Sequence, residues 1–520
     1  MKKLCLHLLV LTLVFQQSIA QPIGSSSVDS LVEKTLKTFD VPGIAVGIVK
    51  DGQVIHAKGY GVRSLNSNLK VNEQTLFGIA SNSKAFTAAA LAMLVDEGKL
   101  NWEDKVTDFI PEFKMYDPYV TENFTIADLL THRSGLGLGA GDLMFFPDSN
   151  NFTRKDIIHN LRYLKQVSSF RTKFDYDNLL YIVAGEVLAR VSGMSWEEYI
   201  EKRILAPLGM KNSAASFSRL SDKSNVVDPH APVDGKVKVI RRDWSENANA
   251  AGGIYSNIAD MSKWILLQLN NGKYGEKNLL KLFSQERQHE MWTIQTVIPT
   301  GGGPTIYNTH FSGYGLGWFL RDAMGYLEAS HTGGLAGIVT QVTLVPELNL
   351  GIVVLTNQQS GAAFTAITNT IKDSYFGIKG KDRVKEMHDR VVKGEANAKK
   401  ITGELWASID SVQKANTSKK DFAAYTGTYT DKWLGDVEIT ISNGKLFFAS
   451  VRSKILAGEM FAYKGNSFIV KWNDRSLDAD AFVKFELDNE GKAIGIKMEA
   501  ISPLTDFSYD FQDLDFVRKK

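Results

Sequence analysis

Residues 44–62, IAVGIVKDGQVIHAKGYGV, contain two runs of β-forming residues around the dipeptide Asp51-Gly52. This dipeptide supports the positive φ angles of a tight two-residue turn, so the segment predicts a β-hairpin. Two more apolar runs lie far along the chain: residues 338–345, IVTQVTLV, and residues 350–357, LGIVVLTN, are joined by the short segment PELN. They predict a second pair of strands.

Helical patterns occupy the chain between these two strand pairs. Apolar residues recur at helical spacing in residues 125–132, 178–191 and 260–269, and loops rich in glycine and proline separate these segments. Strands at both ends of a region with helices between them are typical of an α+β fold. We therefore expect residues 21–378 to form an α+β domain in which both ends contribute strands to one antiparallel sheet.

The character of the sequence changes after Phe376. Residues 379–419 are dense in charge, with Val384 and Met387 at helical spacing, which predicts a solvated amphipathic linker helix. From residue 420 to 520, short alternating strands and turns such as SNGK and DNEG follow one another. This pattern is typical of an all-β sandwich or barrel of roughly 100 residues, and we predict a small barrel-like domain.

The first 20 residues have the order of a secretory signal peptide. Lys2 and Lys3 precede an apolar run from Leu4 to Phe15, and small residues lead to Ala20, after which we expect cleavage. The apolar run is too short to cross a bilayer of about 30 Å as a helix. We expect an exported protein, periplasmic or secreted, with no membrane span in the mature chain.

Removal of this segment limits the chemistry of the mature chain. Cys5 is the only cysteine, so no thiolate nucleophile, disulfide or cysteine-ligated metal remains. The mature chain carries 58 basic and 58 acidic side chains, so no net charge attracts nucleic acid. No H-E-x-x-H zinc motif occurs, and no G-x-S-x-G elbow indicates an α/β-hydrolase. We expect no metal and no cofactor.

A serine three residues before a lysine occurs four times, and the surroundings distinguish the four pairs. Ser81 and Lys84 open the apolar segment SNSKAFTAAALAML, whereas Ser67 lies in a polar loop, Ser411 in the charged linker and Ser442 in a hairpin turn. A serine at the first turn of a helix can use its backbone N–H as an oxyanion donor, and a lysine one turn later lies on the same face. Burial would favour the neutral lysine, which can accept the serine proton. The alternative is a capping serine with a lysine that reaches into solvent.

The surroundings of Ser81 resemble the nucleophile block of the serine β-lactamase and penicillin-binding-protein superfamily, in its β-lactamase-related serine hydrolase branch. That family has a Tyr-x-Asn block next, and two segments match it: Tyr176-Asp-Asn178 and Tyr255-Ser-Asn257. The flanks of the first resemble the family's own block. Those of the second resemble a separate block whose tyrosine has no assigned chemistry, so we assign Tyr176 and keep Tyr255 as the alternative.

The third family block is a Lys- or His-Thr-Gly triplet beside the serine, and His331-Thr332-Gly333 matches it before a strongly β-forming run. The segments LLTHRSGL and YGLGW also resemble family blocks, so the resemblance extends over roughly residues 38–360. We expect His132, in the first of these segments, to be a structural turn residue.

The resemblance implies a role for each matched residue. Ser81 would be the acylated nucleophile and Lys84 its proton acceptor, while Tyr176 would pass the proton to the leaving group and later activate the deacylating water. The implied substrate-binding residues are Asn178, His331, Thr332 and Gly333, and the implied oxyanion hole consists of the N–H groups of Ser81 and Gly334. The resemblance also implies an antiparallel sheet flanked by helices, a helical subdomain, and a lipocalin-like C-terminal β domain.

The resemblance narrows the substrate to a small molecule or short peptide. His331 replaces the lysine of true β-lactamases and removes a fixed positive charge, and the His-Thr-Gly form occurs in D-alanyl-D-alanine carboxypeptidases. This implies a hydrolase of amide bonds in D-amino-acid or peptidoglycan-type peptides or in β-lactams. A carboxylesterase of the same family, or a sensor that binds peptides or β-lactams without turnover, are the alternatives. A homo-oligomer is compatible with the sequence. We expect the C-terminal domain to be a stabilising cap, or else to act in gating substrate access or in oligomerisation.

Overall fold

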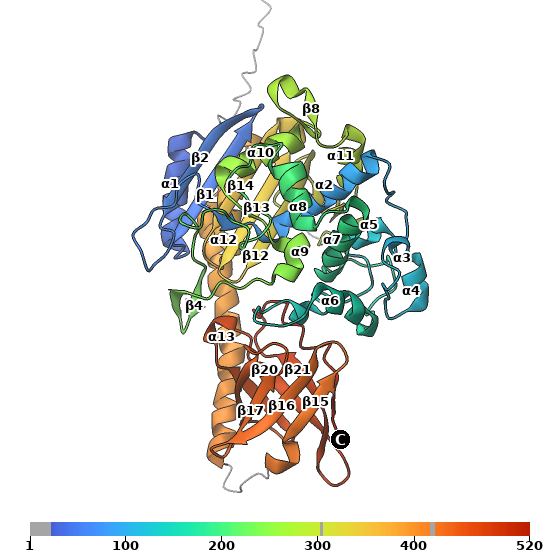
Figure 1. The fold of residues 1–520 in the computed structure, drawn as a ribbon. Helices are drawn as coiled ribbons and strands as arrows, with labels where there is room; N and C mark the ends of the chain where they lie inside the picture. Colours follow the sequence, from blue (N-terminus) through green and yellow to red (C-terminus); the bar gives the residue numbers. More distant parts are fainter. Residues whose placement is uncertain (1–21, 302–304, 416–421) are drawn as a thin grey trace, which may run out of the picture.

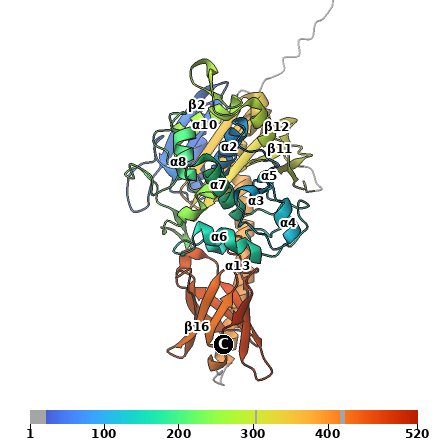
Figure 2. The same cartoon turned by 45° about the vertical axis from the view of Figure 1, so that its right-hand side comes forward.

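The computed structural model describes residues 22–301, 305–415 and 422–520, so the predicted signal segment lies outside the described residues. Two modules follow each other along the chain (Figure 1). The larger one contains a sheet with helices on both faces, and the smaller one is a β-barrel. The long helix α13 (Arg383–Ala415) starts on the larger module and continues along the barrel, as the rotated view in Figure 2 also shows.

The larger module is built on an eight-stranded sheet with the order β2-β1-β14-β13-β12-β11-β10-β9, and every neighbouring pair is antiparallel. The predicted hairpin is present, with positive φ at Asp51 and Gly52. The first strand pairs with the last one in register Ile44↔Thr356, so the two ends of the domain meet in one sheet and the predicted α+β fold is confirmed. The strands are β1 (Gly43–Lys50), β2 (Gln53–Gly61), β9 (Thr296–Val297), β10 (Ser312–Tyr314), β11 (Phe319–Ala323), β12 (Tyr326–Leu335), β13 (Ile338–Val345) and β14 (Leu350–Thr356).

Both faces of the central strands are buried, because helices cover each of them (Figure 1). Ile44 and its alternate neighbours pack against α1 (Ser25–Thr38) and α12 (Gly361–Phe376), whereas Ala45 faces the side covered by α10 (Ile258–Leu269). A strand buried on both faces needs apolar residues at every position. This explains why the sequence of β1 and β14 is continuously apolar and does not alternate.

A helical subdomain lies on the α10 side of the sheet. Its longest helices are α2 (Ser83–Asp96) and α7 (Leu179–Ser192), which are buried along most of their length and are therefore almost wholly apolar. The helical pattern of residues 125–132 forms only the four-residue helix α5 (Ile126–Leu129), because His132 adopts a positive φ of 52° and turns the chain away. The remaining helices are α3 (Val106–Phe109), α4 (Pro118–Asn123), α6 (Arg154–Asn160), α8 (Trp196–Ile200), α9 (Asn249–Gly252) and α11 (Gln285–Met291).

The C-terminal module is a closed antiparallel barrel of eight strands, which confirms the barrel-like prediction. The last strand pairs with both the first and the seventh strand and so closes the sheet. Large side chains such as Tyr429, Phe448 and Phe485 are buried within the module. Its strands are β15 (Gly427–Asp431), β16 (Gly435–Ser442), β17 (Lys445–Ser450), β18 (Ala457–Ala462), β19 (Ser467–Trp472), β20 (Ala481–Leu487), β21 (Ala493–Ala500) and β22 (Phe516–Arg518).

Specific polar and aromatic contacts hold the barrel against the larger module. The guanidinium of Arg452 forms an ion pair of 3.0 Å with Asp156 and lies 3.7 Å from the ring centre of Phe152. The side-chain amide of Asn160 donates to the carbonyl of Trp433 at 2.8 Å. The barrel therefore contacts the larger module at α6 and at the residues just before this helix.

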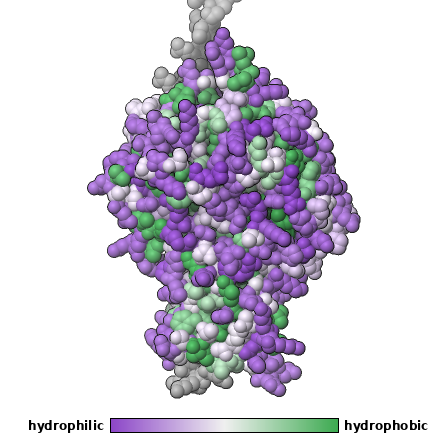
Figure 3. Space-filling view, viewed as in Figure 1, coloured by the Kyte–Doolittle hydropathy of each residue, from purple (hydrophilic) through white to green (hydrophobic). Residues whose placement is uncertain are grey.

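The surface of the larger module is mostly hydrophilic on the face shown in Figure 3, and more hydrophobic residues appear over the barrel in the same view. Of the helices in the described ranges, none combines the length and the apolar composition needed to cross a membrane.

Candidate active site

Ser81 lies in a 3-10 turn, η1 (Ala80–Asn82), directly before α2 begins at Ser83. The residue at the N-cap of α2 is Asn82, and no side chain caps this helix, so Ser81 is not a capping serine. The preceding residue, Ala80, has a φ of 50°, a conformation that costs energy for a residue with a Cβ atom. The backbone thus presents Ser81 on a strained turn at the end of a buried helix.

Lys84 is fully buried and its amine contacts Ser81. Its Nζ lies 3.1 Å from Oγ of Ser81, 2.7 Å from Oδ1 of Asn178 and 2.9 Å from the carbonyl oxygen of Ala251. Burial lowers the pKa of Lys84 to about 7, although the charges of Asp142 and Asp177 oppose this effect. A substantial fraction of the amine is therefore neutral at physiological pH, and a neutral amine can accept the serine proton.

Tyr176 is the tyrosine that the fold brings to Ser81. Both residues line the same cavity, and the centre of the Tyr176 ring lies 4.9 Å from Nζ of Lys84. Burial raises the pKa of the Tyr176 phenol well above 10, and its interaction with the Ser81 hydroxyl opposes this rise. The phenol stays protonated, and in the described part of the chain its buried oxygen has no hydrogen bond of ordinary geometry.

Tyr255, the alternative candidate, lies elsewhere. It is on the short strand β6 (Tyr255–Ser256), which pairs with β3 (Phe77–Gly78), and its hydroxyl accepts a hydrogen bond of 3.4 Å from Arg242. Asn257 accepts the backbone N–H of Asp260 and caps α10. The second Tyr-x-Asn segment is thus occupied with structural contacts.

Asn178 connects Lys84 to a buried carboxyl group that the sequence analysis missed. Its Oδ1 accepts from Lys84, and its Nδ2 donates at 2.7 Å to Oδ2 of Asp142. The same carboxyl oxygen accepts at 2.8 Å from Oγ of Ser508, a residue of the barrel module. Burial raises the pKa of Asp142 to about 8, and the hydrogen bonds from Ser508 and Asn178 act in the opposite direction. A continuous chain of hydrogen bonds therefore runs from the barrel to Lys84.

His331 is held neutral by burial and by the nearby charge of Lys84, and its ring makes two hydrogen bonds. Its Nδ1 donates at 2.6 Å to the carbonyl of Thr332, so Nε2 accepts the hydroxyl of Tyr314 at 2.8 Å. Burial and the nearby charge of Lys84 lower the pKa of His331 to about 3. The imidazole on the cavity wall therefore carries no positive charge at neutral pH.

Strand β12 places the remaining predicted residues beside Ser81. A Cβ atom on Gly333 would lie 2.2 Å from the carbonyl oxygen of Ile79, so only glycine permits this close approach of the strand to η1. In the described structure, β11 pairs with β12 only as far as Ser330, which leaves the following segment facing the cavity. Thr332 and Gly334 line that cavity, as an oxyanion donor at Gly334 requires.

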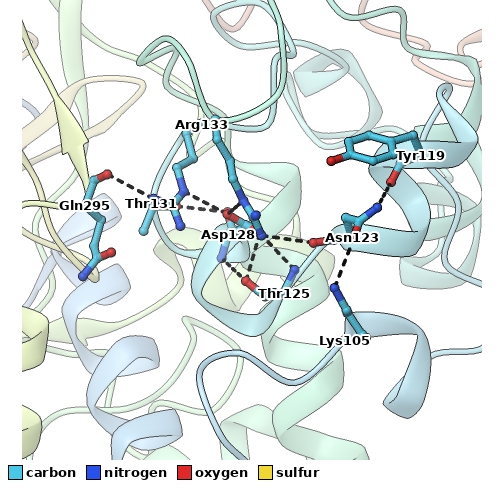
Figure 4. Close-up of polar contacts among 9 residues, drawn as sticks. Lys105, Tyr119, Asn123, Thr125, Asp128, Thr131, Arg133 and Gln295 are labelled. Carbon is cyan, nitrogen blue, oxygen red and sulfur yellow. Dashed lines mark hydrogen bonds and ion pairs between the residues drawn. The ribbon is translucent and has the colours of Figure 1, made fainter.

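His132 supports the Tyr176 loop, as expected of a structural turn residue. Its Nδ1 accepts the backbone N–H of Asp177, and its ring centre lies 4.1 Å from that of Tyr176. The turn that carries it is anchored by Asp128, which accepts from Thr125 at the start of α5 and from Arg133 at 2.8 Å (Figure 4). This polar cluster fixes the backbone under the aromatic rings of the site.

The site lies in a cavity of about 460 Å³ between the two modules. The larger module contributes Ser81, Tyr176, Asn178, His331 and residues 332–335, and the barrel contributes residues 476–478, 504 and 506–509. Within the ranges that the structure describes, no cluster of three or more histidine, cysteine or acidic side chains is arranged to hold a metal ion. The arrangement can transfer an acyl group through a serine, with a lysine and a tyrosine as proton carriers.

Two residues of this site were not found by sequence reasoning. Asp142 stands alone among small and apolar residues in GAGDLMFF, and an isolated acid in such a segment is a signal of a buried polar role. Ser508 carries no such signal, because it lies in the C-terminal domain, 366 positions from its partner.

Comparisons with known proteins show which families the two modules match. Residues 28–374 match the family model described as Beta-lactamase, and residues 412–518 match a domain of unknown function, DUF3471. "Unguisins hydrolase ungD" of Aspergillus violaceofuscus is 26% identical over 442 residues, which are 80% of this chain and 76% of that protein. "Unguisins hydrolase ungD'" of Aspergillus campestris is 30% identical over 67% of this chain and 65% of that protein. "Protein flp" of Staphylococcus aureus is 29% identical over 65% of this chain and 64% of that protein.

Solved structures share the fold over almost the whole chain. The octameric penicillin-binding protein homologue from Pyrococcus abyssi has a TM-score of 0.60 at 22% identity and covers 95% of this chain and 100% of its own. The crystal structure of SurE has a TM-score of 0.55 at 17% identity, with 95% of this chain and 99% of its own covered. The family model spans more than half of the residues and contains the nucleophile, tyrosine and histidine blocks described above. The chain belongs to the beta-lactamase family.

Proposed function

We propose that this chain is an exported serine hydrolase that forms an acyl-enzyme on Ser81 and cleaves amide bonds in short peptides of D-amino acids, in peptidoglycan-type peptides or in β-lactams. One observation carries the proposal: the buried Nζ of Lys84 lies 3.1 Å from Oγ of Ser81. A serine hydroxyl is a poor nucleophile until a base within hydrogen-bond reach takes its proton. Lys84, with its lowered pKa, meets that condition.

The proposed reaction has two balanced steps. Oγ of Ser81 attacks the carbonyl carbon while neutral Lys84 takes the hydroxyl proton, and the N–H groups of Ser81 and Gly334 stabilise the oxyanion. The C–N bond breaks when the leaving amine receives a proton through the phenol of Tyr176. Water then attacks the ester carbon and gives up one proton to the Tyr176 and Lys84 pair. The bond between the acyl carbon and Oγ of Ser81 breaks, and the pair returns a proton to Oγ, which frees the acid and restores the serine hydroxyl.

Two relatives support a hydrolase, and one solved structure supports D-amino-acid substrates. Two of them are named hydrolases of unguisins, and one solved structure of SurE is described as a complex with D-Leu. A carboxylesterase is the second candidate, because the aromatic cavity wall and the neutral His331 suit an uncharged acyl group.

Turnover assays test the proposal. The enzyme is expected to hydrolyse p-nitrophenyl butyrate and D-alanine p-nitroanilide, with Ser81→Ala lowering kcat/KM by roughly 10³-fold or more. Ser67→Ala is the matched control, since Ser67 also precedes a lysine by three residues but lies in a loop. Activity that persists in Ser81→Ala would refute the proposal. Rapid ester cleavage without amide cleavage would assign an esterase, and a single burst without turnover would assign a sensor.

Export and self-association are separate predictions. The signal segment lies outside the described residues, and detection of a mature N-terminus at Gln21 would test it. The solved relative from Pyrococcus abyssi is described as octameric, which makes the mass of this protein in solution worth measuring.

A further inference from the structure

Among the residues that the structure describes, the charged side chains that line the cavity are two carboxylates, and both come from the barrel. Asp478 follows the short turn at residues 475–477, and Asp506 lies in the loop between β21 and β22. Both keep accessible surface, and neither takes part in an ion pair within the described ranges. No lysine or arginine is among the described residues on the cavity wall. The barrel thus gives the cavity a negative charge.

The basic groups close to the cavity are already paired. Arg475 donates to both oxygens of Asp480, at 2.6 and 2.9 Å. The amine of Lys84 is surrounded by its three hydrogen-bond partners, and His331 is neutral. A carboxylate on a substrate would therefore meet like charges in this cavity without a free cation to offset them.

The rest of the wall suits a cation. Aromatic faces attract an ammonium group, most strongly where water is excluded. Aromatic side chains line the wall from both modules, among them Phe145, Tyr176 and Phe319 of the larger module and Phe507 and Tyr509 of the barrel. Oδ1 of Asp506 accepts the backbone N–H of Ser508 at 2.9 Å, which holds the carboxylate in place.

We propose that Asp478 and Asp506 select substrates that carry a protonated amine. The substrate class is then amino-acyl amides, amino-acyl esters and peptides with an accessible ammonium group, in preference to peptides or β-lactams that present a carboxylate. The inference rests on the proposed hydrolase function of Ser81. Burial in the cleft raises the pKa of both aspartates, and an incoming ammonium group supplies the opposite charge that favours their ionised form.

Matched substrates test the selection. The values of kcat/KM are compared for D-alanine p-nitroanilide and D-alanyl-D-alanine p-nitroanilide with a free amine, an acetylated amine or a succinylated amine. These are cationic, neutral and anionic versions of one acyl group. A second pair, acetyl-D-alanyl-D-lysine amide and acetyl-D-alanyl-D-norleucine amide, places the charge on the leaving group. In either the acyl-group series or the leaving-group pair, we expect kcat/KM to be tenfold or more higher for the cationic substrate than for the neutral one. The series that shows this preference tells on which side of the scissile bond the amine binds.

Variants connect the preference to the two aspartates. The double variant Asp478→Asn/Asp506→Asn keeps the shape of both side chains. It should reduce the ratio of kcat/KM for the cationic substrate to kcat/KM for the neutral substrate to near 1. Glu490→Gln removes one negative charge from an exposed turn of the same barrel, away from the cavity wall, and should leave the ratio unchanged.

The outcomes separate this inference from the proposed function. Equal rates for cationic and neutral members in both arms, or a ratio that the double variant does not change, would overturn the selection by the barrel. In that case, hydrolysis of uncharged p-nitrophenyl butyrate would still show that the chain is a hydrolase that uses Ser81. If the unmodified protein does not hydrolyse p-nitrophenyl butyrate, the proposed hydrolase function is contradicted instead.

Discussion

The two segments share the Tyr-x-Asn pattern, and each directly precedes a helix, yet their side chains have different roles in the fold. Asn257 caps α10 with its side chain, whereas Asn178 sits at the N-cap of α7 and makes no capping bond. Its amide instead binds Lys84 and Asp142. The amide of Asn178 is thus committed to the contacts around Lys84 and does not cap its helix.

The largest expected difference between the two segments concerns their tyrosines. Tyr176→Phe removes the phenol beside Ser81 and should lower kcat by 10²- to 10⁴-fold, the usual contribution of a general acid or base. Tyr255→Phe removes a hydroxyl that accepts a 3.4 Å hydrogen bond from Arg242 and should change kcat by less than about threefold. Steady-state kinetics on one ester measures both. Equal losses, or a larger loss for Tyr255→Phe, would reverse the assignment.

Substitution of Asn178 should affect catalysis, whereas substitution of Asn257 should affect stability. Asn178→Ala leaves Lys84 and Asp142 without their shared partner, and we expect kcat to fall by about 10²-fold. Asn257→Ala removes a cap and should cost about 1 kcal/mol of unfolding free energy with kcat nearly unchanged. Thermal unfolding and kinetics of the two variants together test this distinction. A normal kcat for Asn178→Ala would show that the link to Lys84 is not needed.

The smallest effect is expected at the barrel end of the hydrogen-bond chain. The acylation rate of the unmodified enzyme should rise as the pH increases through about 7, because only neutral Lys84 accepts the proton. In Ser508→Ala, Asp142 loses a hydrogen bond that lowers its pKa, so it is protonated more readily and stabilises the Lys84 ammonium less. The midpoint of the rate profile should therefore move to lower pH, with a change in rate of a few fold.

Ser442→Ala is the control for this variant, because Ser442 lies at an exposed hairpin of the same barrel. Its rate profile should coincide with that of the unmodified enzyme. A Ser508→Ala profile with an unchanged midpoint would show that the barrel does not influence Lys84.

Much of the fold and the core of the site could be predicted from the sequence. The Asp51-Gly52 turn and the doubly buried strands have local signatures, and so does the apolar helix behind Ser81. The order of the serine, tyrosine and histidine blocks was sufficient to place Tyr176 and His331 in one cavity with Ser81. These predictions depend on patterns within short segments or on their order.

The contribution of the barrel could not be predicted, because it depends on how two modules dock. Nothing local to Asp506 or Ser508 shows that their loop lines a cavity formed by the other module. The neutrality of His331 likewise depends on its burial and on the nearby charge of Lys84, which arise only in the folded domain. Such contacts follow from tertiary packing, for which a single sequence carries no pattern.

Identification of the acylated residue tests most directly whether Ser81 is the nucleophile. The enzyme is incubated with p-nitrophenyl acetate, quenched in acid, and digested for peptide mass spectrometry, with Ser81→Ala and Ser67→Ala treated in parallel. We expect one acetyl group on the peptide that contains Ser81, present in Ser67→Ala and absent in Ser81→Ala. An acetyl group on another residue that persists in Ser81→Ala would contradict it.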